Sequence, residues 1–93
     1  MIIGALTIEF HFPHARSLKD KRRVLHGFKE RLKGRHNVAV AELDHQDKWQ
    51  RALVGIVTVN SQAAVVGDVL QRILSDARVL EGAVVVHHEI RWL

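Results

Sequence analysis

NVAVAELDHQDKWQRALVGIVTV, residues 37–59, is the stretch that decides the fold. Residues 37–44 alternate between apolar and polar or small side chains, and residues 49–59 are rich in valine, leucine and isoleucine, so each segment is predicted to be a strand. The intervening residues 44–48 (DHQDK) are polar and typical of a turn. Because the connection is so short, the two strands are predicted to form an antiparallel hairpin.

A strand and a helix are predicted before this hairpin. Residues 2–12 alternate with period two, and Pro13 ends the ladder because it has no N–H to donate. Ser17 is predicted to cap a helix, supported by Asp20 three residues later, and Gly34 is predicted to end it. The expected buried positions are Ile2, Gly4, Leu6, Ile8, Phe10 and Phe12 on the strand, and Leu18, Val24, Leu25, Phe28 and Leu32 on the helix.

A second helix and a last strand are predicted after the hairpin. Asn60 or Ser61 is expected to cap this helix and Gly82 to end it. Its buried stripe is Val66, Val69, Leu70, Ile73, Ala77 and Leu80. Residues 83–93 are predicted to be a strand with Val84, Val86, His88, Ile90 and Trp92 on one face, and Val85, His87, Glu89 and Arg91 on the other.

The predicted order β-α-β-β-α-β is the ferredoxin-like α+β pattern. Right-handed crossovers place both helices on one face of a four-stranded antiparallel sheet and leave the other face open. Residues 1–93 are long enough for one domain only. Without cysteine and without an apolar run of about 20 residues, the chain is expected to be a cytoplasmic protein that does not span a membrane.

Positive charge is concentrated in one segment. Residues 16–35 hold nine lysines and arginines against Asp20 and Glu30, whereas the other 73 residues hold five basic and eight acidic side chains. Such a segment favours a polyanionic partner, because the field is attractive at one place only. The predicted phosphate- or RNA-binding residues are Arg16, Ser17, Lys19, Lys21, Arg22, Arg23, Lys29 and Lys33. The alternative is an ordinary solvated helix face, and Lys21, which points toward the sheet by helical angle, has its own alternative as a snorkelling side chain.

The topology gathers further polar residues at the end of the molecule where the first helix begins. There His11, His14, Asp44, His45 and Asp47 offer an alternative metal or small-ligand site, since imidazole and carboxylate groups are ligands for borderline metals. The nearby lysines and arginines oppose a dication. Residues 11–16 lack the glycine-rich phosphate loop of acylphosphatases, and no other catalytic motif is present. We therefore predict no enzyme activity and no cofactor.

The open sheet face is predicted to be a self-association surface. Its expected residues on the first strand are Ile3, Ala5, Thr7, Glu9 and His11, which include no aromatic side chain on which a base could stack. Val85 and part of the 49–59 strand add apolar surface. An apolar sheet face is costly to leave in water, so we expect a homo-oligomer.

Three segments also resemble a known family. SLKDKRRVL (17–25), NVAVAE (37–42) and DHQDKWQRA (44–52) are similar to the YlxP-like family of small bacterial proteins of unknown function. The resemblance implies a ferredoxin-like fold and, because genes of the family commonly lie among those for translation and ribosome maturation, an association with RNA or the ribosome. It supplies no catalytic residues. The matching residues Glu42, Asp44, Gln46, Asp47 and Trp49 are interpreted as a rim or structural clasp between the first helix and the hairpin.

Overall fold

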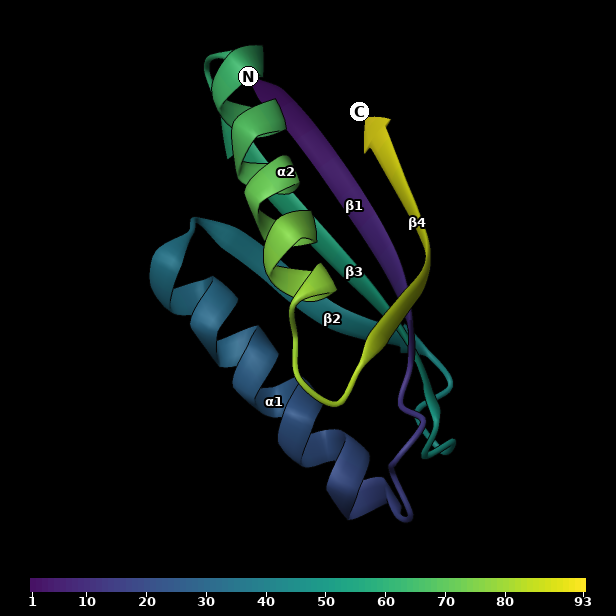
Figure 1. Ribbon diagram of the computed structural model, residues 1–93. Coiled ribbons are helices and arrows are strands. Elements are labelled where there is room, and N and C mark those ends of the chain that lie inside the picture. The colour runs from purple at the N-terminus through teal and green to yellow at the C-terminus, as the bar shows by residue number, and fades with distance from the viewer.

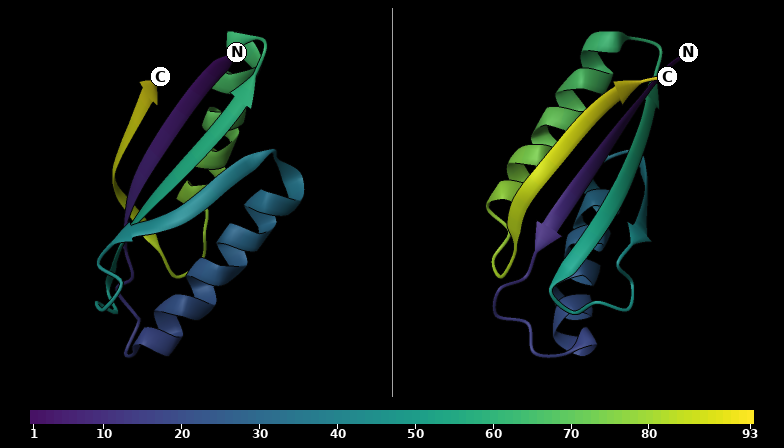
Figure 2. Two further views of the ribbon diagram at one scale, coloured as in Figure 1. Left: turned by 180° about the vertical axis from the view of Figure 1, so that it is seen from behind. Right: turned by 90° about the vertical axis from the view of Figure 1, so that its right-hand side faces the viewer.

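The computed structural model describes residues 1–93 and confirms the predicted fold. The element bounds are β1 Ile2–His11, α1 Leu18–Arg35, β2 Val38–Asp44, β3 Arg51–Asn60, α2 Ala63–Arg78 and β4 Val84–Trp92 (Figure 1). The four strands form one antiparallel sheet in the order β2-β3-β1-β4. Seen from behind, the sheet lies in front of both helices, so one of its faces is uncovered (Figure 2). Neither helix has the length and apolar character needed to cross a membrane.

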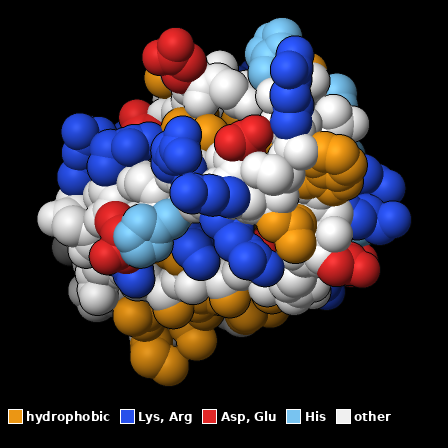
Figure 3. Space-filling model, turned by 90° about the horizontal axis from the view of Figure 1, so that it is seen from below, with side chains coloured by type: hydrophobic (Ala, Val, Ile, Leu, Met, Phe, Trp, Pro, Cys, Tyr) orange, Lys and Arg blue, Asp and Glu red, His pale blue; other side chains and the backbone are white.

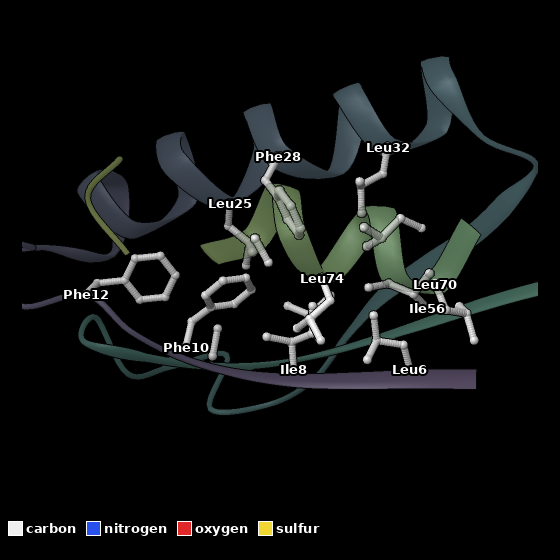
Figure 4. Close-up of a cluster of buried hydrophobic side chains, with 14 of the residues drawn as sticks. Leu6, Ile8, Phe10, Phe12, Leu25, Phe28, Leu32, Ile56, Leu70 and Leu74 are labelled. Carbon is white, nitrogen blue, oxygen red and sulfur yellow. The ribbon is translucent and has the colours of Figure 1, made fainter. Parts of the chain in front are cut away.

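The core lies between β1, β3 and the two helices. Leu6, Ile8 and Phe10 of β1 are fully buried, as the period-two pattern predicts. The Phe10 ring packs edge-on against Phe28 of α1, with the ring centroids 5.5 Å apart (Figure 4). Helix α2 packs over β1, β3 and β4, whereas α1 packs over β2. Each helix therefore covers its own part of the sheet.

The helix ends differ slightly from prediction. The side chain of Ser17 caps α1, but the helix continues through Gly34 to Arg35, and the N–H of His36 donates to the carbonyl of Leu32. Helix α2 begins after Gln62, whose side chain makes no capping hydrogen bond. The Asn60 side chain instead accepts from the Gln62 N–H at 3.0 Å.

The end of α2 lies before the predicted terminator. The helix ends at Arg78, and Gly82 lies beyond it with a positive φ of 88° in the turn that leads to β4. A glycine suits this turn because other residues rarely adopt that conformation. The strand bounds shift by one or two residues at their ends, where ladder hydrogen bonding stops.

A β-bulge in β4 corrects the predicted faces of this strand. Glu9 pairs with His87, but its neighbour Phe10 pairs with Val85, so Val86 is the extra residue. For Val84 and Val85, which precede the bulge, the alternation of side chains between the two faces of the sheet is therefore shifted by one residue. Val85 packs against the core, and Val84 is exposed opposite His11. The prediction that Val85 lies on the open face is wrong for this reason.

Candidate functional site

The first turn of α1 is fixed by reciprocal side-chain contacts with the backbone. The Ser17 hydroxyl accepts from the N–H of Asp20 at 3.1 Å, and the Asp20 carboxylate accepts from the N–H of Arg16 at 3.0 Å. These contacts occupy backbone donors that a helix leaves unpaired at its start. Lys21 follows on the buried face of the helix, together with Leu25, Phe28 and Leu32.

Lys21 is a fully buried lysine whose donors are all occupied. Its Nζ donates to Glu42 Oε2 at 2.8 Å, to the carbonyl of His45 at 2.8 Å and to the carbonyl of Arg51 at 3.0 Å. An ammonium group has three hydrogens, so none remains for a ligand. The predicted role of Lys21 in phosphate binding is therefore wrong, and Lys21 instead joins α1 to β2, β3 and the turn between them.

The turn that presents these carbonyls depends on one unusual backbone conformation. His45 has a positive φ of 67°, which turns its carbonyl so that both Lys21 and the N–H of Lys48 donate to it. Asp44 Oδ1 accepts from the His45 N–H at 2.7 Å. Gln46 donates from its side chain to the Glu42 carbonyl at 3.3 Å. Glu42 and Gln46 thus belong to the clasp, while Asp44 supports the turn.

The remaining rim residues face solvent. Asp47 and Trp49 are exposed and line a shallow depression with Lys48, Gln50 and Arg51. Trp49 leaves about half of its surface open, at 49%. Neither residue contacts Lys21, so the clasp involves fewer residues than the resemblance implied.

The exposed basic residues of the predicted set gather around the beginning of α1. Arg16, Lys19, Arg22 and Arg23 are all exposed, and no carboxylate lies within 4.0 Å of any of these four side chains. Lysine and arginine side chains crowd the end of the molecule that Figure 3 shows from below. Farther along the helix, Lys29 is half-buried and Lys33 pairs with Glu30 at 2.7 Å. The uncompensated charge is thus strongest at the first turns of α1.

The structure adds two arginines that the predicted set omitted. Arg31 and Arg35 line a groove of about 420 Å³ between α1 and the end of α2, together with Arg23. Arg35 lies 3.9 Å from Asp76 of α2, whereas Arg31 has no acidic partner. Both residues were visible in the charge count, but only the placement of α2 shows that they border a groove.

The predicted metal-binding alternative is not supported by the geometry. No three histidine, aspartate or glutamate side chains lie close enough together to hold one ion. His45 lies 3.7 Å from Glu9 and 3.8 Å from Asp44, while His14 is exposed on the loop after β1. The topology brings the predicted residues to one end of the molecule without bringing their side chains together.

A family model described as "Protein of unknown function (DUF503)" matches residues 3–90. The chain belongs to this family. It is 38% identical over 74 residues to "Uncharacterized protein YlxP" of Bacillus subtilis (strain 168), a match that covers 80% of each chain. The resemblance predicted from the three sequence segments is therefore confirmed.

Two solved structures share the fold of this DUF503 chain. A de novo designed protein, Foldit4, matches with a TM-score of 0.54 and 16% identity over 99% of this chain and 94% of its own. A C-terminal segment of the alpha subunit of aIF2 from Pyrococcus abyssi matches with a TM-score of 0.56 and 17% identity. The latter match covers 98% of this chain and 49% of the other. At such low identity, both matches describe the fold alone.

On the open face of this DUF503 protein, Glu9 is the centre of a small charged cluster. Arg51 donates to its carboxylate at 2.5 Å. This hydrogen bond lowers the pKa of Glu9 below the usual 4.5; burial opposes the shift, and the charges of Arg51, His45 and His87 add to it. A carboxyl with a lowered pKa stabilises the folded state above pH 4.5, and this contribution is lost as the pH falls through the folded-state pKa.

A Glu9→Gln variant is therefore expected to lose more stability relative to the wild type at neutral pH than in acid. The measurement is the urea midpoint of both proteins from about pH 7 to about pH 3. Glu81→Gln serves as the control, because exposed Glu81 has no basic partner within 4.0 Å. A gap between Glu9→Gln and the wild type that does not change with pH would contradict this role for Glu9.

Proposed function

We propose that this protein binds RNA through the exposed basic residues at the beginning of α1, and that it does so without catalysing a reaction. The observation that carries the proposal is the set of four exposed side chains, Arg16, Lys19, Arg22 and Arg23, that lack a carboxylate partner. Unpaired cations on one surface attract a phosphate backbone and release its counterions on binding.

The acidic residues of the same segment do not cancel this charge. Asp20 is engaged with the backbone N–H of Arg16, and Glu30 pairs with Lys33. The buried cation Lys21 is compensated separately by Glu42. Against the four exposed cations, the first turns of α1 hold only the one carboxylate of Asp20, so their net charge is positive, and this supports a polyanionic partner.

Ribosomal RNA is the proposed source of the phosphates. The sequence resemblance implied a ribosomal association, and the open sheet face offers no aromatic platform for individual bases. Binding is thus expected to depend on the phosphate backbone more than on base sequence. Co-sedimentation with purified ribosomal subunits tests the source, and fluorescence anisotropy with a labelled single-stranded RNA tests the mode of binding.

We expect the affinity for single-stranded RNA to fall steeply with salt. Four phosphate contacts give a slope of about −3 for the logarithm of the association constant against the logarithm of salt concentration. A Lys19→Glu/Arg22→Glu double variant should reduce the slope by about 1.4 and the affinity by more than about tenfold. Glutamate near a helix N-terminus is compatible with the helix dipole, so the variant is expected to stay folded.

The matched control is Arg72→Glu/Arg78→Glu on α2, which changes the net charge equally. Both arginines are exposed, and Arg72 makes only a surface pair with Asp68. Neither arginine belongs to the first turns of α1, so this control should lose less than about threefold. Equal losses in both variants would reject α1 as the binding surface. Failure of the wild type to bind either subunits or free RNA would reject the proposal as a whole.

A further inference from the structure

The uncovered face of the sheet is apolar over most of β2, β3 and the first half of β1. Leu43, Val57 and Val59 are 52%, 41% and 38% exposed. Their neighbours on this face are small or partly buried, and Ala5, Ala41 and Gly55 line a hollow of about 260 Å³ with Leu43 and Val57. Helices cover only the opposite face, so nothing within the chain protects this surface from water (Figure 2).

The shape of this surface suits a second sheet. Because alanine and glycine have small side chains or none, the centre of the face forms a hollow. The side chain of Leu43 lies over Gly55, and a Cβ added to Gly55 would lie 2.7 Å from Leu43 Cδ1. Two sheets that pack face to face stand about 10 Å apart, a spacing filled by interdigitating apolar side chains. Surfaces of this kind are well matched to one another.

The charges of the face identify the partner. It carries Glu9 with Arg51, and Glu89 with Arg91, so its glutamates and arginines balance. The first turns of α1, by contrast, are uncompensated and positive. A face that carries the carboxylates of Glu9, Glu89 and Asp44 besides its two arginines offers little to a polyanion or to a strongly acidic protein. A second copy of the same chain brings matching apolar area and matching charges of both signs.

We propose that two copies of this chain form a dimer through their open sheet faces. In one row across the sheet, Val57 pairs with Ala5 and Ala5 pairs with Arg91. In the adjacent row, Gly55 pairs with Thr7 and Thr7 pairs with Glu89. We place a two-fold axis between these rows, running across the strands. The first row of one copy then lies opposite the second row of the other copy. Arg91 of each copy then faces Glu89 of the second copy.

In the dimer, a pair between Arg91 and Glu89 of different copies replaces the pair between these residues within one chain. Within one chain, Arg91 Nε lies 4.0 Å from Glu89 Oε1 on an exposed edge strand, which is the limit of an ion pair. In the dimer the same groups meet across the interface at its margin. Such pairs fix register and orientation more than they add affinity. The apolar rows at the centre supply the main driving force.

The area is sufficient for a specific dimer of moderate strength. Four strands about 4.8 Å apart and about nine residues long present a face of about 500–600 Å² before side chains are added. Stable interfaces bury about 800 Å² per partner, so this one lies toward the small end. We therefore expect an equilibrium between monomer and dimer that depends on protein concentration.

Sedimentation velocity over a concentration series tests the dimer directly. The wild type is expected to approach twice the 10.6 kDa of the chain as concentration rises. Val57→Lys places a charge at the centre of the face and should make the protein monomeric throughout. Val79→Lys, the same change at a position 81% exposed after α2, should leave the dimer unchanged. If Val57→Lys fails to fold by circular dichroism, Leu43→Lys at the exposed bulge takes its place.

The register is tested by a charge exchange. Glu89→Arg and Arg91→Glu should each weaken the dimer by about tenfold, because like charges then face each other. The double variant Glu89→Arg/Arg91→Glu should return to within about threefold of the wild type. A wild type that stays monomeric at every concentration, or a dimer indifferent to both Val57→Lys and the charge exchange, overturns the proposal. RNA binding does not enter any of these measurements, so the dimer stands or fails independently of the proposed function.

Discussion

Replacement of Lys21 by alanine is expected to reduce the free energy of unfolding by about 3–5 kcal/mol, the cost of removing one partner from a buried ion pair. The change leaves the Glu42 carboxylate, which is only 15% exposed, without its cation. It also leaves the carbonyls of His45 and Arg51 without the donors at 2.8 Å and 3.0 Å. The total free energy of unfolding of a domain of this size is about 5–15 kcal/mol, so much of the stability depends on one side chain.

Chemical denaturation of the variants provides the measurement. Lys19→Ala is the matched control, since Lys19 lies two residues earlier on the same helix and is exposed; its change should stay within about 0.5 kcal/mol. Lys21→Met/Glu42→Gln removes both charges and is expected to recover part of the loss, which keeps the test usable if Lys21→Ala does not fold. A loss for Lys21→Ala no larger than that for Lys19→Ala would show that the clasp does not stabilise the fold.

Gly4→Ala is expected to cost about 1–3 kcal/mol, and Gly4→Val more, because β1 and α2 are in close contact at this point. A Cβ on Gly4 would lie 2.5 Å from Val66 Cγ1 and 2.9 Å from Leu70 Cδ1. Both of these side chains are buried in the core, so neither can swing into solvent. The helix must shift away from the sheet, which loses packing along its length.

A glycine-to-alanine substitution at another position should change the stability in the opposite direction. Gly34 lies in α1, and nothing is within 4 Å of a Cβ added there. Gly34→Ala is therefore expected to stabilise the protein by up to about 1 kcal/mol, as alanine is the better helix former. Thermal unfolding of the two variants compares them directly. Equal effects would mean that the Gly4 contact is not restrictive.

Hydrophobic periodicity was sufficient to predict the fold. Each strand and helix follows from a regular pattern, and the alternation of residues 2–12 identified the buried face of β1 correctly. The helical angle of Lys21 also predicted that it leans toward the sheet. The contact of Lys21 with the His45 carbonyl could not be predicted, because it depends on the left-handed conformation of His45, and nothing local marks this residue as the one that adopts it.

Three other departures from prediction arose from features that lie outside local patterns. The faces of β4 depend on the extra residue Val86, and a bulge is set by pairing with β1 rather than by the sequence of β4 itself. The metal-binding alternative followed from topology alone. Topology places residues at one end of the molecule, but it does not show whether their side chains are close enough to bind one ion. Arg31 and Arg35 were omitted because the groove they border requires the position of α2.

The bulge at Val86 also bears on whether the protein polymerises. The two edge strands, β2 and β4, each contain a break in register, at Leu43 and at Val86. An interrupted edge presents only a short regular row of N–H and C=O groups, so another chain cannot easily extend the sheet sideways. Growth by strand addition has no natural end and leads to fibrils. Because both edge strands are interrupted, pairing through the open sheet face is favoured over strand addition at the edges. Such pairing stops at a dimer and does not lead to fibrils.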